Sequence, residues 1–345
     1  MGHRKKSAPR RGSLGFMPRK RAEEIVPRVK TWPSPVVERP TLLGFIGYKV
    51  GMTHAYIIDN RQGSPTFGKE VFTPITVVEA PPVYVLAVRG YTYDENKGLL
   101  AAGEAWVKPP LELELQRRVS TLGEFDTEAA LKKLEGMLGD LKEVRVLVAT
   151  QPKLAGGLSK KAPDLLEVKV AAPNDDVKLA FDYAKSLLGR QVSVADVFKP
   201  GMMVDVIAVT RGKGFQGEVK RFGVKILPRW HKHRKGARGV GARSHGKGTW
   251  WEIPQAGQLG FHRRTEYNKR ILDITDSAES YTPAGGFLHY GMPRSTLVVL
   301  EGSIPGVPKR PVVLRYPVRP PKWFLKLGVV KPTITFVSLQ SKQGA

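Results

Sequence analysis

The 345-residue sequence contains no cysteine. This absence excludes disulfide bonds, thiol nucleophiles and cysteine-ligated metal sites. No apolar run approaches the roughly 18 residues of a membrane-spanning helix, and no hydrophobic region follows the basic N-terminus as it would in a secretory signal. We therefore expect a cytoplasmic protein without a membrane partner.

Acidic residues are almost absent from two segments. Residues 1–21 contain eight Lys or Arg and no acid, and residues 211–270 contain 16 Lys or Arg against three acids. Together these segments carry 21 of the 25 excess positive charges of the chain. Because so much like charge repels itself, an anionic partner is needed. Nucleic acid fits, since lysine and arginine displace its condensed counterions and glycine lets a backbone approach phosphates.

A glycine-rich stretch, GKGFQGEV, follows the apolar run MMVDVIAVT and matches two nucleotide-binding patterns. The rest of either site is missing. No carboxylate follows before Glu252, Gly223 and Pro228 interrupt any long helix, and the kinase motifs H-R-D and D-F-G are absent. H-E-x-x-H and G-x-S-x-G are absent too. We therefore predict no catalytic residues, no cofactor and no small-molecule substrate.

Four histidines lie in the second basic segment, His231, His233, His245 and His262. They could suggest zinc, but a dication would enter a strongly positive field with no carboxylate close to the His231 and His233 pair. We therefore predict no metal site, and contact with phosphate or bases instead.

Short runs of β-branched and aromatic residues separated by Gly and Pro predict a mainly antiparallel barrel or sandwich. Between about 104 and 200 the composition changes to 15 acids and 15 bases, with two amphipathic helices. One is expected from about Asp126 to Leu138, and the other between an N-cap at Asn174 and Gly189. This region is predicted to be an α/β insertion between barrel strands.

Residues 222–270 show neither helical nor strand periodicity, and aromatic residues alternate with their charges. Such a mixture suits RNA, whose bases stack on aromatic rings while lysines follow the backbone. Trp230 and Tyr267, near the ends of the segment, could instead pack on the barrel.

Four motifs occur in order along the chain: GHRKKSAPRRGSLGFMPRKRA, LLGFIGYKVGMTH, DVIAVTRGKGFQGEVKRFGVK and WEIPQAGQLGFHRRTEYNKRI. Together they resemble the L3 family of large-subunit ribosomal proteins in its archaeal and eukaryotic form, and we expect an archaeal source. The resemblance implies a translation-protein-type β-barrel with an α/β insertion. It also implies a basic N-terminal arm and a long central loop that enter large-subunit ribosomal RNA.

The function implied by the resemblance is structural and not enzymatic. Such a protein binds ribosomal RNA in the cytoplasmic ribosome, beside other large-subunit proteins. It supports subunit assembly and, through its central loop, the organisation of the peptidyl transferase centre and aminoacyl-tRNA accommodation.

On this basis we divide the chain into six parts. They are a basic arm and proline-rich connector (1–40), a first part of the barrel (41–103), the α/β insertion (104–200), a second part of the barrel (201–224), an RNA-penetrating loop (225–265) and the completion of the barrel with the C-terminal segment (266–345).

The predicted RNA-binding residues come from the arm and the central loop. The family's loop-tip tryptophan precedes an A-G-Q run, and Trp251 matches it, although Trp250 doubles the aromatic and Gln255 stands where a basic residue is usual. His245 aligns with a family histidine. The full set is Arg4, Lys5, Lys6, Arg10, Arg11, Arg19, Lys20, Arg21, Arg211, Lys213, Lys220, Arg221, Lys232, His233, Arg234, Lys235, Arg238, Arg243, His245, Lys247, Trp250, Trp251, Gln258, His262, Arg263 and Arg264.

Two other functions remain open from the sequence. An RNA-modifying enzyme would require a cofactor pocket or a paired acid and base. A general nucleic-acid-compacting protein is suggested by charge alone, and it would bind duplex DNA as well as structured RNA.

Overall fold

The computed structural model describes residues 10–119, 126–226 and 248–340. Contacts divide the chain into two compact units. The larger unit consists of Glu24–Ala208 and Arg264–Ala345, and the smaller unit consists of Met1–Glu23 and Val209–Arg263.

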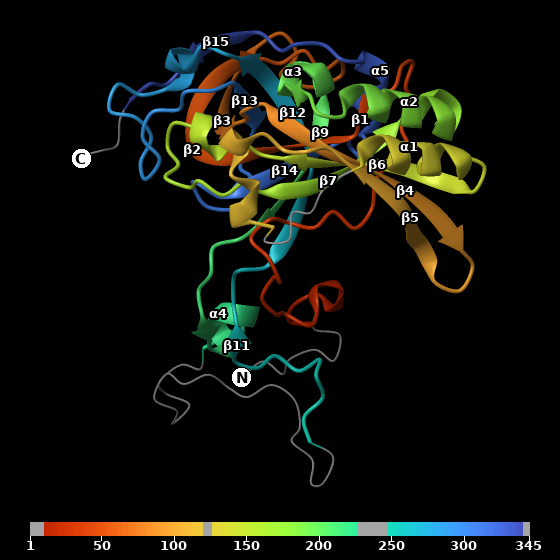
Figure 1. The fold of residues 1–345 in the computed structure, drawn as a ribbon. Coiled ribbons are helices and arrows are strands. Elements are labelled where there is room, and N and C mark those ends of the chain that lie inside the picture. Colours follow the sequence, from red (N-terminus) through yellow and green to blue (C-terminus); the bar gives the residue numbers. More distant parts are fainter. Residues whose placement is uncertain (1–9, 120–125, 227–247, 341–345) are drawn as a thin grey trace. The chain divides into compact units, whose positions relative to one another are not determined.

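The larger unit contains a closed β-barrel (Figure 1). Its strands pair in the order β14, β9, β12, β13, β3 and β2, and β2 also pairs with β14, which closes the ring. A further strand, β15, pairs with β2. The mainly β class predicted from the sequence is confirmed. The strands are β2 (Gly44–Ile58), β3 (Glu70–Glu79), β9 (Met203–Val209), β12 (Arg263–Thr275), β13 (Leu297–Glu301), β14 (Pro311–Arg315) and β15 (Ile334–Val337).

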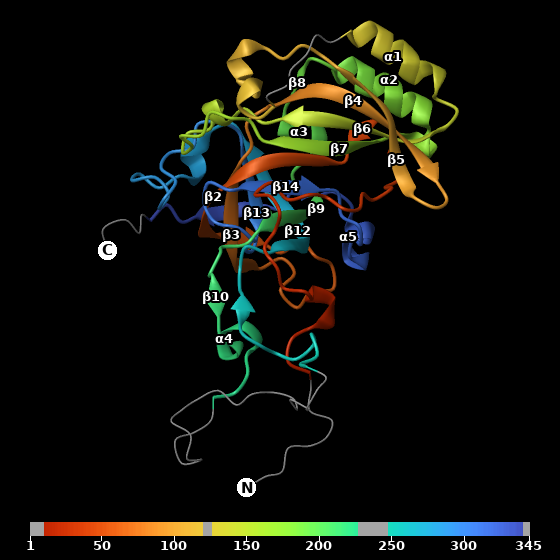
Figure 2. The same ribbon diagram turned by 60° about the horizontal axis from the view of Figure 1, so that its bottom comes forward.

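A second sheet in this unit pairs in the order β1, β7, β6, β4 and β5, with β8 attached to β4. Helices α1 and α2 lie next to each other on it (Figures 1 and 2), and Leu134, Phe181 and Ala184 from these helices join a core cluster with valines of β6 and β7. The bounds are β1 (Thr41–Leu42), β4 (Val83–Asp94), β5 (Gly98–Trp106), β6 (Leu141–Ala149), β7 (Leu165–Ala171), β8 (Gln191–Val192), α1 (Thr127–Gly136), α2 (Val177–Leu187), and the shorter helices α3 (Val194–Val197) and α5 (Lys322–Leu327).

Strands β4 and β5 do not pair with the barrel strands, although we expected residues 41–103 to belong to the barrel. They hydrogen-bond within the six-stranded sheet. Strand β4 is rich in β-branched residues, as the barrel strands are, so its composition does not distinguish the two sheets. Its sheet is decided by pairing with β6 and β8, which lie far along the chain.

The two helices begin and end close to their predicted positions. Helix α1 begins after Asp126, whose side chain accepts the N–H of Ala129 at 3.1 Å and so caps the helix. Helix α2 is capped by Asp176 and not by Asn174, which lies in a short 3-10 turn with a φ of 57°. Among the described residues, no helix is long and apolar enough to cross a membrane.

Strand β9 is buried along its whole length, which explains its nearly continuous apolar sequence, MVDVIAV. Its single charged residue, Asp205, pairs with Arg315 of β14 at 2.7 Å, and both side chains are almost completely buried. Asp205 also accepts the backbone N–H groups of Asn268 and Val318, each at 3.1 Å. Arg315 donates to the Thr31 carbonyl at 2.6 Å. One ion pair therefore joins three barrel strands to the segments before and after the barrel.

We predict that Asp205→Ala lowers the free energy of unfolding by about 3–5 kcal/mol, because it leaves the buried Arg315 guanidinium without its counter-ion. Guanidinium chloride unfolding measures this loss. The control is Glu135→Ala, which removes an exposed ion pair with Lys185 and should change stability little. Equal unfolding midpoints for the two variants would contradict a structural role for the buried pair.

Candidate RNA interface

The smaller unit brings together two legs of the chain between β9 and β12, the outgoing leg (residues 210–226) and the return leg (residues 248–262). Strand β10 (Phe215–Gln216) pairs antiparallel with β11 (Gly257–Gln258). Nearer the barrel strands, the N–H of Lys213 donates to the Leu259 carbonyl, and the N–H of Leu259 donates to the Gly214 carbonyl, each at 2.9 Å. The loop thus leaves β9 and returns to β12 as a hydrogen-bonded pair of chains.

The glycine-rich stretch forms part of the outgoing leg. It leads into α4 (Glu218–Phe222), which begins after Gly217 and ends at Gly223, where φ is 66°. Five residues are far from the long helix that a dinucleotide site requires. On the return leg Gly260 has a φ of 75°, and a Cβ there would lie 2.1 Å from the Arg211 carbonyl oxygen. The close approach of the two legs therefore requires glycine at 260.

Arg221 holds three segments of this unit together. Its Nε and Nη1 donate to the carbonyls of Gln258 and Gln255, both at 2.9 Å, and its Nη2 donates to the Arg19 carbonyl at 3.2 Å. Burial, and then the charge of Arg19, lower the pKa of Arg221 below its ordinary value. All three nitrogens of the guanidinium thus donate to backbone carbonyls of the arm and the return leg.

Arg19 returns this contact. Its Nη1 donates to the Arg221 carbonyl, and its guanidinium lies 4.2 Å from the centre of the Phe222 ring. Gly12 lies beside both groups, and a Cβ there would be 2.8 Å from each of them. The arm is therefore fitted closely to α4.

His262 fixes the arm to the return leg. Its ring is 7% exposed, and Nδ1 lies 2.9 Å from the Lys20 carbonyl, which can only accept a hydrogen bond. Nδ1 therefore carries the proton. Next to it, the N–H of Ala22 donates to the Phe261 carbonyl at 2.7 Å.

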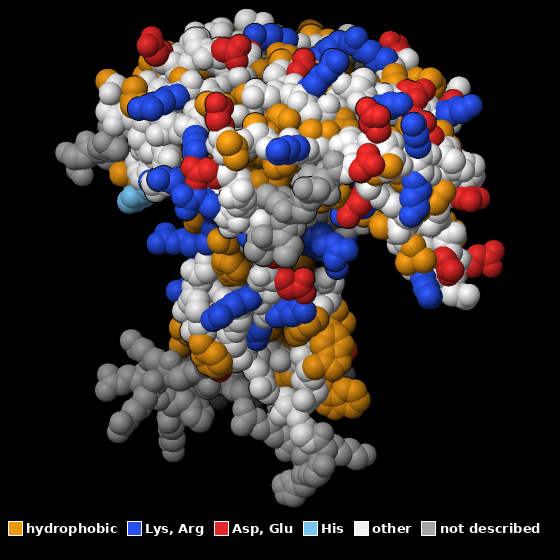
Figure 3. Space-filling view, in the orientation of Figure 1, with side chains coloured by type: hydrophobic (Ala, Val, Ile, Leu, Met, Phe, Trp, Pro, Cys, Tyr) orange, Lys and Arg blue, Asp and Glu red, His pale blue; other side chains and the backbone are white. Residues whose placement is uncertain are grey.

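Other predicted residues of the unit extend outward. Lys20, Arg211, Lys213 and Lys220 are exposed. Figure 3 shows basic and hydrophobic side chains interspersed on this unit. Arg10 is exposed and pairs with Glu252 at 3.1 Å. Arg21 is also exposed, and it donates to the Gln258 side chain at 3.3 Å. The other described residues of the predicted set are partly buried: Arg11, Arg263 and Arg264.

Three aromatic residues of the two legs are strongly exposed, whereas Phe222 is buried and Phe261 is partly buried. Trp250 is 71% exposed and Trp251 is 60% exposed, and the carbonyl of Trp250 accepts the N–H of Ile253 in a turn. Phe215, which the sequence analysis did not include, is 77% exposed. Its position between glycines in a basic stretch was the signal that could have identified it. In the larger unit Tyr267 of β12 is 57% exposed, so the barrel does not bury its ring.

Part of the predicted set lies outside the described residues, and so does Trp230. These residues are Arg4, Lys5, Lys6, Lys232, His233, Arg234, Lys235, Arg238, Arg243, His245 and Lys247.

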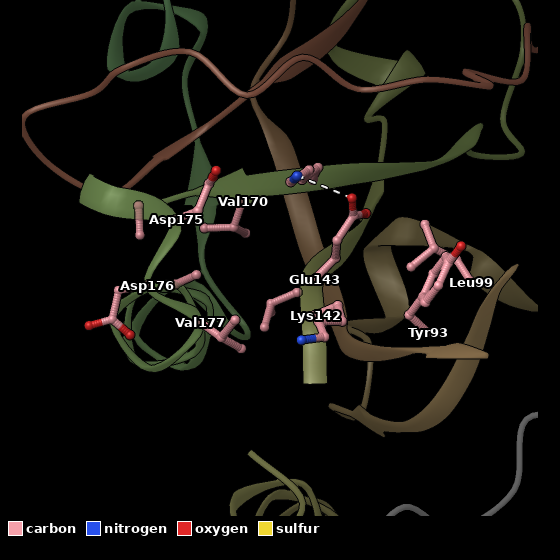
Figure 4. A pocket seen from close by; sticks show the side chains of 12 residues that line it. Tyr93, Leu99, Lys142, Glu143, Val170, Asp175, Asp176 and Val177 are labelled. Atoms are coloured by element: carbon pink, nitrogen blue, oxygen red, sulfur yellow. Dashed lines mark hydrogen bonds and ion pairs between the residues drawn. The ribbon is translucent and has the colours of Figure 1, made fainter. Parts of the chain in front are cut away.

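A cavity of about 510 Å³ lies in the larger unit, between the β4–β5 hairpin and the N-terminal end of α2 (Figure 4). Burial opposes the ionisation of Glu143, but a hydrogen bond from Arg145 and the charge of Lys169, 3.1 Å away, outweigh it and lower the pKa of Glu143. Asp175 and Asp176 lie apart from it on the α2 side. Two basic neighbours thus hold Glu143 as a carboxylate, and the cavity does not offer the paired acid and base that an RNA-modifying enzyme would require. Among the described residues, no cluster of His, Asp and Glu could hold a metal.

We predict that Arg221→Gln opens the paired legs locally. Hydrogen bonds from a charged group contribute about 1.5–3 kcal/mol each, so amide exchange at Lys213 and Leu259 should accelerate by roughly 10- to 100-fold. Hydrogen exchange on the free protein measures this. Lys220→Gln removes the same charge from an exposed neighbour and should leave both amides protected. Equal exchange in both variants would refute the organising role of Arg221.

Comparison with known proteins matches residues 1–344 to the family described as Ribosomal protein L3. The chain is 64% identical over 344 residues to large ribosomal subunit protein uL3 of Aeropyrum pernix, and the match covers both chains completely. It is 55% identical to uL3 of Pyrobaculum calidifontis, covering 96% of this chain and 98% of the other. It is 48% identical to uL3 of Saccharolobus solfataricus over the full length of both. The family expected from the sequence motifs is confirmed, and the chain belongs to the ribosomal protein L3 family.

Proposed function

We propose that the smaller unit binds large-subunit ribosomal RNA and thereby supports assembly of the subunit. As a member of the L3 family, the protein is a structural component of the large ribosomal subunit in the cytoplasm, and it is not an enzyme. We also propose that other large-subunit proteins are its neighbours.

One observation carries the proposal: the basic residues of the smaller unit have two different roles. Arg19 and Arg221 bind backbone carbonyls and hold the arm against the loop legs. Lys20, Arg211 and Lys213 remain exposed on the frame so formed. Positive charge on a hydrogen-bonded frame, with few acids nearby, complements a phosphate backbone.

The exposed rings favour RNA over duplex DNA. Phe215, Trp250 and Trp251 project large apolar surfaces that are unfavourable in water. Unpaired bases in structured RNA can stack on them, at about 1–3 kcal/mol per base, whereas the stacked bases of a regular duplex cannot. A general DNA-compacting function would leave these rings without a role.

We expect that replacing Lys20, Arg211, Lys213 and Lys220 together by glutamine weakens binding to deproteinised large-subunit rRNA. The slope of log affinity against log salt should become shallower by about 3, because each phosphate contact contributes about 0.7 to 0.9. Filter binding over a series of KCl concentrations gives this slope.

The matched control replaces four exposed lysines of the larger unit, Lys97, Lys132, Lys133 and Lys178, and so removes the same charge. It should leave the slope nearly unchanged. If the two variants lose affinity equally, binding depends on net charge alone and the smaller unit is not the interface.

We further propose that the central loop helps to organise the peptidyl transferase centre and aminoacyl-tRNA accommodation. The exposed Trp250–Trp251 pair and the turn that follows it support this role, because such rings can wedge against RNA without being needed for the protein's own core.

Trp251→Ala should leave the melting temperature of the free protein and its incorporation into subunits largely unchanged, because the ring is 60% exposed and the basic residues provide most of the anchoring charge. In reconstituted ribosomes it should slow aminoacyl-tRNA accommodation or peptidyl transfer, which rapid kinetics can resolve. Trp32→Ala is the control, since Trp32 packs against the core of the larger unit and its loss should lower the melting temperature. A destabilised Trp251→Ala protein with normal translation kinetics would reject the loop-tip role.

A further inference from the structure

The C-terminal part of the chain lacks acidic residues as completely as the arm does. Residues 302–345 contain eight Lys or Arg and no Asp or Glu. We propose that residues 316–331 of the larger unit, including helix α5, form a third ribosomal RNA contact, independent of the arm and the central loop. This inference rests on the proposed function, because it takes ribosomal RNA as the partner.

The segment is fixed to the barrel at both ends. Before α5, the N–H of Val318 donates to the buried Asp205, and the Asn268 side chain of β12 donates to the Arg319 carbonyl at 2.9 Å. After α5, the buried Arg270 of β12 donates to the Val330 carbonyl at 2.8 Å. Exposed side chains between these points are therefore presented on a fixed backbone.

Helix α5 is itself anchored by its tryptophan. The guanidinium groups of Arg61 and Arg270 lie 5.9 Å and 6.0 Å from the centre of the Trp323 ring. With Trp323 held in this way, Lys322 and Lys326 are exposed and, four residues apart, lie on one face of the helix. Leu325 next to them is 67% exposed.

Basic residues within and beside the segment divide into paired and exposed ones. Arg315 pairs with Asp205, and Lys331 pairs with Asp273 at 2.6 Å. Arg319, Lys322 and Lys326 are exposed, and no ion pair to them occurs among the described residues.

RNA is the partner that this pattern fits best. Three cations on a fixed backbone, none of them in an ion pair among the described residues, complement closely spaced phosphates. The exposed Leu325 adds an apolar surface suited to a sugar or base face.

The test compares the triple variant Arg319→Gln, Lys322→Gln, Lys326→Gln with the control Lys132→Gln, Lys133→Gln, Lys178→Gln. The control removes equal charge from exposed positions of α1 and α2. Each full-length protein is titrated with deproteinised large-subunit rRNA over a series of KCl concentrations. We expect the C-terminal variant to have a log–log salt slope shallower by about 2 to 3, at 0.7 to 0.9 per contact, and the control to match the unsubstituted protein. Melting temperatures should agree for all three, since the substituted side chains are exposed.

Acetylation of lysines in the binary complex of protein and rRNA provides a second measurement. Protection of Lys322 and Lys326 in that complex, without any other protein, supports the inference. Protection that occurs only in whole subunits would assign the surface to a protein neighbour and overturn it, as would a C-terminal variant that binds like the control. If the C-terminal variant behaves normally while the smaller-unit variant loses affinity, only this third contact fails. If the unsubstituted protein does not bind the rRNA, the proposed function itself fails.

Discussion

The buried Asp205–Arg315 ion pair is the interaction on which the larger unit depends most. A buried charged pair is costly to desolvate, and additional hydrogen bonds to its two partners offset part of that cost. Here the carboxylate accepts two backbone N–H groups, and the guanidinium also donates to the carbonyl of Thr31. The connector before the barrel and the segment after it are thus bound to the same point. These bonds also fix β9 and β12, the two strands between which the basic loop is inserted.

In the smaller unit, arginine and lysine have different tasks for a physical reason. A guanidinium has five N–H donors in a plane and stays charged, so Arg221 can bind three carbonyls from two other segments at once and Arg19 can combine a carbonyl with an aromatic face. Lysine is a compact, strongly hydrated charge, better suited to an exposed position facing phosphate. Lys20 and Lys220, which follow and precede the two inward arginines in the chain, are exposed.

The sequence predicted the mainly β class of the fold, because the class follows from local composition. It could not assign the β4–β5 hairpin to a sheet, since β6 and β8, the other partners of β4, come later in the chain and resemble barrel strands in composition. It placed the N-cap of α2 at Asn174 because Asn174 and Asp176 are two residues apart and both residue types cap helices. In the structure Asn174 lies in a 3-10 turn, and Asp176 caps the helix. Arg19 and Lys20 look alike in sequence. Only the carbonyls supplied by distant segments distinguish an organising arginine from an exposed lysine. The acid-free C-terminal segment was visible in the sequence, but its charges are too widely spaced to form a cluster there.

The three bonds of Arg221 also have a consequence for binding energetics. Separating the arm from α4 removes the Arg19 acceptor, and separating the return leg removes the Gln255 and Gln258 acceptors, so either separation leaves this part-buried guanidinium with fewer partners. The arm and the loop are therefore thermodynamically linked. A ligand that binds only the arm also shifts the loop toward its paired form. A second ligand that then binds the loop loses less conformational entropy, because the loop is already ordered. Two RNA segments that never touch each other would then bind this protein with positive cooperativity, transmitted through one arginine side chain.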